Sequence, residues 1–352
     1  MRCFIGGYGP EISAVELDPD DGSMEVVRSV TTPKNASFLY AVSEPRLLYA
    51  AVESGYQSGD SGKVAAYKLD GDLLPTAIGS AESCGVGPCH IEVDVDQRLL
   101  AVANYGGENF AVLRVGADGK PGEQLACVQH EGHSVNAARQ EEPHPHATHF
   151  SPDGAFLFVC DLGTDAVMRY RVSELVAGSA DGSVATQTTP GSGPRHLAFS
   201  PDGQHAYLVN ELSNTVVAYA YGSADGTLTQ INEGSMLPDS FDGESTAAEI
   251  AVHPSGRFLY ASNRGHDSIT VFQRDTESGS LERVGCADTT GSGPRHFSID
   301  PTGNWCIVAN QFTDHVVSFR VHQESGSLTW SGHSLSVPTP SCALFWPVPR
   351  QP

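Results

Sequence analysis

The stretch GPRHLAFSPDGQHAYLVNELSNTVVAY, from Gly193 to Tyr219, contains two short apolar runs on either side of Ser-Pro-Asp-Gly and a third run after Asn214. The same phrase returns between Gly293 and Phe319 as GPRHFSIDPTGNWCIVANQFTDHVVSF. Runs of β-branched and aromatic residues bounded by Pro, Asp and Gly are typical of short strands joined by tight turns. A phrase that recurs in this way predicts a fold built from one repeated unit.

Further copies of this phrase occupy most of the chain. Two looser copies begin at Pro145 and Thr246, and two fainter ones begin at Gly87 and Ala36. The anchor positions of the six copies are Ser43, Val95, Pro152, Pro201, Pro254 and Pro301. In the last four copies a turn glycine follows two residues later, namely Gly154, Gly203, Gly256 and Gly303. A period of about 50 residues without helical periodicity is typical of the blades of a β-propeller.

The two ends of the chain complete one more copy. The C-terminal TPSCALFWP aligns with a first strand, placing Pro340 on Pro194, Phe345 on Phe199 and Pro347 on Pro201. The N-terminal segments RCFIGGY, ISAVELD and MEVVRSV match the second, third and fourth strands. We therefore predict an all-β, seven-bladed β-propeller in which residues 1–352 form a single domain. One blade is built from both termini, so that the ring has no open edge.

The composition limits the possible partners and the compartment. The net charge is −22, with 42 acidic against 20 basic residues, which argues against nucleic acid or an anionic membrane as a partner. Only four basic residues are lysines, as in salt-adapted proteins, although an ordinary acidic bacterial enzyme also fits. No apolar run is long enough to span a membrane, and Met1 leads directly into the first strand, so no signal peptide is expected.

The cysteines favour a reducing environment. The eight cysteines form no CxxC pair, and Cys160, Cys286 and Cys306 fall in strand-like stretches as small buried hydrophobes would. We therefore expect reduced thiols and a cytoplasmic protein. The sequence leaves the oligomeric state open.

Two sets of positions differ from blade to blade, whereas the Pro, Gly and aliphatic positions recur and belong to the framework. The residue just before the first strand of each copy reads Ser37, Cys89, His146, Arg195, Ala248, Arg295 and Ser341. The residue eight positions after the turn glycine reads Tyr8, Glu53, Tyr105, Leu162, Glu211, Arg264 and Gln311. Both sets are expected on one face of the propeller, next to the central channel. That channel mouth is the predicted ligand site.

The residues predicted at this channel mouth include three arginines, which is unusual in so acidic a protein. The cluster consists of His146, Arg195, Glu211, Arg264 and Arg295, with Tyr105 and Gln311 nearby. The planar guanidinium group suits carboxylate or phosphate, so the cluster indicates an anionic small molecule. Alternatively, Arg195 and Arg295 could form structural ion pairs, for example with Glu211. A neutral imidazole among arginines should have a lowered pKa, which suits His146 as a general base.

Other chemistries lack support in the sequence. His90, His196 and His296 belong to recurring phrases, so they are expected to be structural and to donate hydrogen bonds between blades. His144, His146 and His149 invite a metal interpretation, but acidic ligands are not expected nearby, and we predict neither metal nor cofactor. No GxSxG elbow or Ser-x-x-Lys motif is present, which favours acid/base chemistry over a covalent intermediate.

The phrases GPRHLAFSPDG, VNEL, AEIAVHPSGRFLYASNRGHDSI and the second GPRH resemble the bacterial lactonase family of seven-bladed propellers. The best-known activity of that family is 6-phosphogluconolactonase, and a fungal relative is carboxy-cis,cis-muconate cyclase. The resemblance covers essentially the whole chain, although GGYG at Gly6 departs from the family's usual Gly-Thr-Tyr-Thr. It implies that a histidine, two arginines and a glutamate form the active site. These correspond to His146, Arg195, Arg264 and Glu211.

Together these features predict a metal-independent lactone hydrolase acting on 6-phospho-D-glucono-1,5-lactone, a substrate of the pentose phosphate pathway. His146 is the expected base for water, and Arg195 and Arg264 are expected to bind the anion and the oxyanion. Glu211 is expected to orient an arginine or relay a proton. Substrate contacts are assigned to Arg295, Tyr105 and Gln311. Two alternatives stay open: a muconate-type lactonising enzyme and a binding propeller without catalysis.

Overall fold

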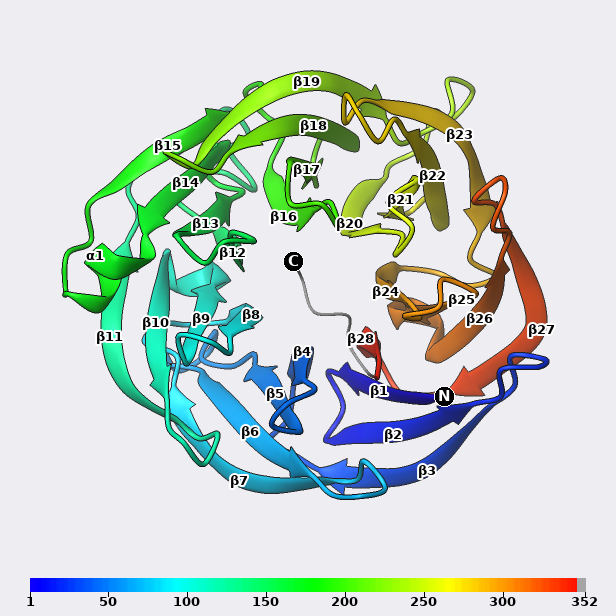
Figure 1. Cartoon of the computed structure of the whole chain (residues 1–352), viewed down its shortest axis with the longest axis horizontal. Helices are drawn as coiled ribbons and strands as arrows, with labels where there is room; N and C mark the ends of the chain where they lie inside the picture. Colours follow the sequence, from blue (N-terminus) through cyan, green and yellow to red (C-terminus); the bar gives the residue numbers. More distant parts are fainter. Residues whose placement is uncertain (347–352) are drawn as a thin grey trace.

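The computed structural model describes residues 1–346. Its β-strands are arranged around a central axis, and in each blade they take four successive positions from innermost to outermost (Figure 1). The innermost strands are β4 (Ala36–Val42), β8 (Pro88–Asp94), β12 (Pro145–Phe150), β16 (Pro194–Phe199), β20 (Thr246–Val252), β24 (Pro294–Ile299) and β28 (Pro340–Phe345). Their neighbours are β1 (Arg2–Gly7), β5 (Leu47–Val52), β9 (Leu99–Asn104), β13 (Phe156–Asp161), β17 (His205–Asn210), β21 (Phe258–Arg264) and β25 (Trp305–Asn310).

The two outer positions complete each blade. The third strands are β2 (Glu11–Leu17), β6 (Lys63–Leu69), β10 (Asn109–Val115), β14 (Ala166–Arg171), β18 (Thr215–Gly222), β22 (Ser268–Arg274) and β26 (His315–Val321). The outermost strands are β3 (Met24–Thr31), β7 (Pro75–Glu82), β11 (Pro121–Gln129), β15 (Gly182–Gln187), β19 (Thr227–Ser235), β23 (Leu281–Asp288) and β27 (Leu328–Ser336). The short helical turns described are α1 (Val172–Val176), η1 (Tyr105–Gly107) and η2 (Gln311–Thr313). In residues 1–346, no helix has the length and apolar character needed to cross a membrane.

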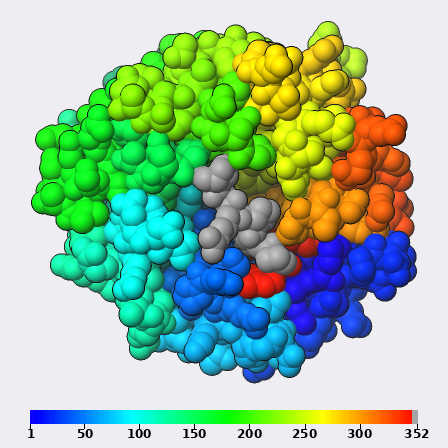
Figure 2. All heavy atoms as spheres, viewed as in Figure 1, coloured from blue at the N-terminus to red at the C-terminus, as the bar shows by residue number. Residues whose placement is uncertain are grey.

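Seven antiparallel four-stranded blades result, as the sequence predicted. Five are separate sheets, and an eight-stranded sheet divides into β4–β7 and the blade β28-β1-β2-β3, which touch through the pair Gly7 and Ala36. β28 pairs with β1 along its length, with Cys3 opposite Phe345. The C-terminal strand therefore lies beside the N-terminal ones (Figure 2), and the prediction of a blade built from both termini is confirmed. The predicted match of Pro347 lies outside the described residues.

The hydrophobic core consists of seven separate clusters among the described residues, one between each pair of neighbouring blades. Phe158 of β13 packs with Leu208 of β17, for example, and Tyr207 packs with Leu259 of the next blade. Burying one such side chain contributes about 1.5–3 kcal/mol. Because each cluster is shared by two blades, a blade is stable only with both of its neighbours present.

The turns between first and second strands are alike in the clearest copies. Gly203 has φ 66°, a left-handed conformation that residues with a Cβ rarely adopt, and its N–H donates to the Ser200 carbonyl. The Ser200 hydroxyl accepts from the His205 N–H at 3.0 Å, which closes the turn. Gly154, Gly256 and Gly303 also have positive φ. This end of each blade is thus fixed by backbone requirements.

The opposite end of each innermost strand contains a β-bulge. In β16, Pro194 pairs with Asn210 and His196 with Val209, which leaves Arg195 without a partner. Each blade has such a bulge, and the bulged residues are Ser37, Cys89, His146, Arg195, Ala248 together with Glu249, Arg295 and Ser341. The sequence placed these residues just before the strand, and this detail was wrong. A bulge turns a side chain out of the regular alternation, here at the channel mouth.

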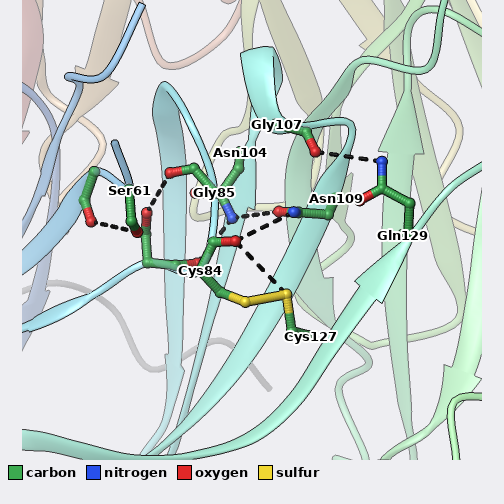
Figure 3. The surroundings of a disulfide bond; sticks show 10 residues. Ser61, Cys84, Gly85, Asn104, Gly107, Asn109, Cys127 and Gln129 are labelled. Carbon is green, nitrogen blue, oxygen red and sulfur yellow. Dashed lines mark hydrogen bonds between the residues drawn. A yellow bond between two sulfur atoms is a disulfide. The ribbon is translucent and has the colours of Figure 1, made fainter. Parts of the chain in front are cut away.

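Two cysteines depart from the expectation of reduced thiols. Cys84, after β7, and Cys127, in β11, form a disulfide beside the hydrogen-bonded pair Asn104 and Asn109 (Figure 3). The chain brings their Cα atoms to 6.4 Å, within reach of a disulfide. Their sequence separation of 43 gave no sign of it. Among the free cysteines, Cys160 and Cys306 are buried as expected, but Cys286 is exposed, because it lies on an outermost strand.

Candidate active site

Glu211 is the centre of a charged cluster at the channel mouth. It follows β17 directly, and its side chain is almost completely buried. One carboxylate oxygen lies 2.6 Å from Arg139 Nη2, and the other lies 3.0 Å from Arg195 Nε and 2.9 Å from Arg264 Nη2. Burial favours the neutral acid, but Arg264, Arg195 and Arg139 hold the pKa of Glu211 well below its usual range. Glu211 is therefore ionised at every physiological pH.

Arg195 and Arg264 are held by backbone carbonyls as well as by Glu211. Arg195 Nη1 donates to the Ala248 carbonyl at 2.6 Å, and Arg264 Nη2 donates to the Ala247 carbonyl at 2.8 Å. Burial, together with the charge of Arg264, lowers the pKa of Arg195 to about 10, so it stays protonated at neutral pH. Among the described residues, the buried Arg264 Nε has no hydrogen-bond acceptor. An oxygen of a ligand could satisfy it.

His146 lies beside this cluster. Its Nε2 is 3.9 Å from the Glu211 carboxylate, and its side chain is 6% exposed. Burial first, and then the charge of Arg195, hold the pKa of His146 well below 6.5. The imidazole is therefore neutral and can accept a proton. The neighbouring Cys89 donates to the His146 carbonyl at 3.2 Å, and burial raises the pKa of this thiol to about 12, so it is no nucleophile.

The other side of the mouth carries a second, looser group. The Arg295 guanidinium lies over the ring of Tyr8 at 5.6 Å, and Tyr8 donates its hydroxyl hydrogen to Glu53 at 2.9 Å. Burial opposes the charge of Arg295, but Tyr8 and Glu53 raise its pKa above the ordinary value. Within residues 1–346, Arg295 forms no ion pair with Glu211. The structural ion pairing considered from the sequence thus exists for Arg195 and not for Arg295.

Arg139 is a member of the cluster that the sequence analysis missed. It lies in the segment Gln129–Pro143, between two blades, and its Nη2 also donates to the Tyr105 hydroxyl at 3.3 Å. Burial opposes its charge, but Glu211 raises the pKa of Arg139 above its ordinary value. Asp161 holds both ends of the segment, through His130 Nδ1 at 2.6 Å and the His144 N–H at 2.8 Å. Arg139 occupies no repeated position, so an alignment of blades could not select it.

The remaining predicted contacts also lie at strand ends on this face. Tyr105 begins η1 after β9 and binds Arg139, and Gln311 begins η2 after β25. The Gln311 Oε1 is buried and has no donor among the described residues. The structure therefore brings His146, Arg195, Glu211 and Arg264 together, with Tyr105 joined to them through Arg139. Arg295 belongs to the group around Tyr8.

A layer of histidines lies one residue further along the innermost strands. His196 Nδ1 donates to Glu249 of the next blade at 3.1 Å. His90 accepts from the Thr148 N–H, and His296 accepts from the Ala343 N–H, both at 3.4 Å. The predicted bonds between blades are confirmed, but His90 accepts rather than donates, and His296 accepts at Nδ1 while its Nε2 lies 3.4 Å from Glu249 of the neighbouring blade. The ring of Phe38 packs against His90 at 4.4 Å, so this layer is part of the packed interior.

A cavity lies on the opposite face of the ring. Its volume is about 800 Å³, and its lining includes the strand ends and turns with Tyr40, Ser43, Glu44, Glu92, Asp94 and Asp153. His146 lies at the other end of β12, one of the innermost strands that reach this cavity. The cavity is acidic and would repel an anion. Volume alone therefore does not identify the site, and the charged cluster is the better candidate.

The sequence analysis expected no acidic metal ligands near His144, His146 and His149, and this expectation was wrong. Glu141 and Glu142 directly precede the Pro143-His144 pair, and the ligand atoms of Glu141, Glu142 and His144 lie within 4.8 Å of one another. The bulge at β12 turns His146 toward Glu211, while His149 bonds Glu92 at 3.0 Å. The three histidines considered from the sequence therefore do not share one site.

The similarity to known proteins extends over the whole ring. The family described as "Lactonase, 7-bladed beta-propeller" matches residues 2–345. A protein of Bacillus subtilis (strain 168) named 6-phosphogluconolactonase is 34% identical over 97% of both chains. One of the same name from Formosa agariphila is also 34% identical, over 84% of this chain and 86% of its own.

A solved structure agrees with these relatives. It is described as the periplasmic gluconolactonase of Pseudomonas aeruginosa, and it superposes with a TM-score of 0.90 at 33% identity. The match covers 98% of this chain and 99% of that one. The similarity in fold and sequence thus includes every blade that contributes to the charged cluster.

Proposed function

Because this chain belongs to the lactonase family of seven-bladed β-propellers and is a hydrolase acting on lactones, we propose that it opens 6-phospho-D-glucono-1,5-lactone to 6-phosphogluconate. The relatives named for this reaction motivate the choice of substrate. The charged cluster supplies the physical support for it.

The observation that carries the proposal is an excess of positive charge in a protein of net charge −22. Four guanidinium groups, those of Arg139, Arg195, Arg264 and Arg295, outnumber the nearby carboxylates of Glu211, Glu53 and Glu249 among the described residues. The neutral His146 adds no charge. An anionic ligand would balance the surplus, and a phosphate accepts several charge-assisted hydrogen bonds at once.

His146 is the proposed general base. Its neutral imidazole takes a proton from water while the water oxygen bonds to the lactone carbonyl carbon. The electron pair of the C=O bond moves onto its oxygen, and Arg195 and Arg264 stabilise the oxyanion. When the tetrahedral intermediate collapses, the bond to the ring oxygen breaks, and this oxygen receives the proton from His146. The products are a carboxylic acid, which ionises, and a free hydroxyl group.

Glu211 acts as a positioning residue in this mechanism. Its lowered pKa excludes it as a proton carrier near neutral pH, which leaves the orienting role of the two roles expected from the sequence. Its two oxygens fix the guanidinium groups of Arg139, Arg195 and Arg264 around one point. We assign the phosphate contacts to Arg139 and Arg295, since each of them leaves donors free for a ligand. Tyr105 and Gln311 lie beside them.

Glucono-1,5-lactone without phosphate is a second candidate substrate. The Pseudomonas aeruginosa relative is described as a gluconolactonase, and its similarity to this chain is as high as that of the proteins named for the phosphorylated lactone. The two substrates differ only in the phosphate. Their relative rates therefore report directly on the proposed phosphate contacts.

A comparison of the two lactones tests the proposal. We expect kcat/KM to be at least about tenfold higher for the phosphorylated lactone, because one charge-assisted hydrogen bond is worth about 1.5–3 kcal/mol. Arg139→Ala and Arg295→Ala should reduce this preference, whereas Arg114→Ala, at an exposed pair on an outer part of a blade, should not. Equal kcat/KM values for the two lactones in the wild-type protein would favour glucono-1,5-lactone as the substrate. Turnover of a muconate alone would refute both substrates.

The cytoplasmic location stays a prediction, and the Cys84–Cys127 disulfide speaks against it, because disulfides persist mainly in oxidising compartments. Alkylation of the protein in its native cells, followed by mass spectrometry, decides the matter. A peptide that joins Cys84 to Cys127 would refute a reducing compartment. Alkylation of both thiols would support it.

A further inference from the structure

His144 lies at the rim of the mouth with its ring orientation fixed. The side chain is 7% exposed, and its ring stacks on that of Tyr105 with 4.4 Å between centroids. The Nδ1 atom lies 3.0 Å from the Tyr105 carbonyl oxygen. A carbonyl only accepts hydrogen bonds, so Nδ1 carries the hydrogen, and in this tautomer the lone pair of the ring lies on Nε2.

That lone pair faces two carboxylates. His144 Nε2 is 4.0 Å from Glu141 Oε2, and Glu142 completes a group whose ligand atoms lie within 4.8 Å of one another. Among the described residues, Nε2 has no hydrogen-bond partner. A lone pair directed at negative charge, on a side chain that is only 7% exposed, is unfavourable unless a positive charge lies between them.

We propose that Glu141, Glu142 and His144 bind one divalent cation of the Zn²⁺ or Mn²⁺ type. An imidazole with two carboxylates suits these ions better than Ca²⁺ or Mg²⁺, which take oxygen ligands. The orientation of His144 supports the proposal independently of the acidic pair. A metal-binding histidine commonly donates its other N–H to a backbone carbonyl, as His144 does to Tyr105.

The geometry needs only a small adjustment. Ligand atoms about 2.0–2.2 Å from an ion lie roughly 3–3.5 Å apart, so the carboxylates must move inward by about 1 Å. Glu141 and Glu142 are exposed and can change rotamer, whereas His144 is already held in place. Water molecules would complete the coordination.

The cation would act on the loop and take no part in the reaction. Its ligands follow Arg139 by two to five residues, and the same segment places Arg139 on Glu211. A bound ion would tie the exposed Glu141 and Glu142 to the buried His144 and so stabilise the position of Arg139. This role differs from the metal-independent chemistry proposed for His146.

Calorimetric titration of the full-length, untagged protein tests the site. After EDTA treatment and dialysis, MnCl₂ and ZnCl₂ are titrated in about 0.5 M NaCl, which screens diffuse binding to the acidic surface. We expect one equivalent to bind. Glu141→Gln, Glu142→Gln and His144→Asn should each weaken binding at least about tenfold, and Glu174→Gln, an exposed control on α1, should not. His144→Asn keeps a donor for the Tyr105 carbonyl while removing Nε2.

Two results would overturn the proposal. One is binding that the three ligand substitutions leave unchanged, which means diffuse association with surface acids. The other is the absence of saturable binding of either ion to the wild-type protein in about 0.5 M NaCl, where diffuse association with the acidic surface is screened. The two glutamate variants keep the test decisive if His144→Asn folds poorly, since both side chains are exposed.

Discussion

The two ends of the innermost strands differ in what they require of the sequence. At one end, tight turns repeat Pro-Asp-Gly or close variants, with glycines such as Gly203 in left-handed conformations. At the other end, each strand has a bulge whose residue differs between blades, from Ala248 to Arg195. The turn end supports the fold, whereas the bulge end presents different side chains at the channel mouth, where some, such as Arg195, also bond to the next blade. Substitutions at the two ends should therefore have opposite effects.

The largest expected effect at the bulge end is that of His146→Asn. We expect kcat/KM for lactone hydrolysis to fall about 10²–10⁴-fold, the usual contribution of a general base. The melting temperature should change little, because asparagine keeps a polar group at the position of Nδ1. A loss of less than tenfold, with fresh lactone and correction for spontaneous hydrolysis, would remove His146 from this role.

Arg195→Ala and Arg264→Ala should lower kcat/KM about tenfold to a hundredfold or more, because each variant removes charge-assisted hydrogen bonds worth about 1.5–3 kcal/mol. Stability should change little, since Glu211 keeps two other guanidinium partners in each variant. Thermal melts and kinetics on the same preparations measure both quantities.

A matched control lies at the turn end. Arg274 is as buried as Arg195, and it binds Asp202 and the Gly256 carbonyl at the turns. Arg274→Ala should lower the free energy of unfolding by about 1.5–3 kcal/mol and leave kcat/KM within twofold. Near-normal turnover with a large stability loss in Arg195→Ala would mean that both arginines are structural, which would contradict the anion site.

The pH dependence of kcat/KM should reflect the lowered pKa of His146. The neutral imidazole is the active form, so activity is lost as pH falls through its pKa, tenfold per unit below it. Because that pKa lies well below 6.5, the acid limb should begin below the usual range of histidine. Arg195→Ala removes a positive neighbour and should move the limb to higher pH. A limb that stays in place in this variant would argue against His146 as the titrating group.

Gly203→Ala should affect only the fold. At φ 66° a Cβ costs about 1–2 kcal/mol, and Pro152 lies 3.2 Å from where this atom would stand. We expect a lower melting temperature and unchanged kcat/KM. A rate loss beyond twofold, measured well below the melting temperature, would show that the two ends are coupled.

The smallest expected effect is that of chelation. EDTA should leave kcat/KM within about twofold, because the proposed reacting groups, His146, Arg195 and Arg264, need no metal. Samples that receive the same treatment without EDTA, with and without added Zn²⁺, serve as controls. Loss of activity on chelation, restored by a divalent ion, would point to a metal-dependent reaction instead.

The repeat explains what the sequence could predict. Aligning the copies gave seven blades and one shared mouth, because every blade has equivalent positions there. It could not give Arg139, which lies in a segment without a counterpart in other blades. The bulge at Arg195 could not be predicted from the sequence either. It becomes visible only in the strand pairing, where Pro194 is opposite Asn210 and His196 is opposite Val209. The Cys84–Cys127 contact depends on how the connection after β7 meets β11, and no sequence pattern encodes it.

The pairing of β28 with β1 also determines when the protein can become functional during its synthesis. β1 is synthesised before the other strands of the ring, yet its partner strand follows more than three hundred residues later. Until then the edge of β1 is open to wrong partners, as unpaired strands are. Blades β12–β23, which supply His146, Arg195, Glu211 and Arg264, are synthesised earlier, but the ring that contains them stays open until β28 pairs with β1. Loss of Pro340–Phe345 should therefore favour aggregation of newly made chains, even though these residues lie far in sequence from the catalytic histidine.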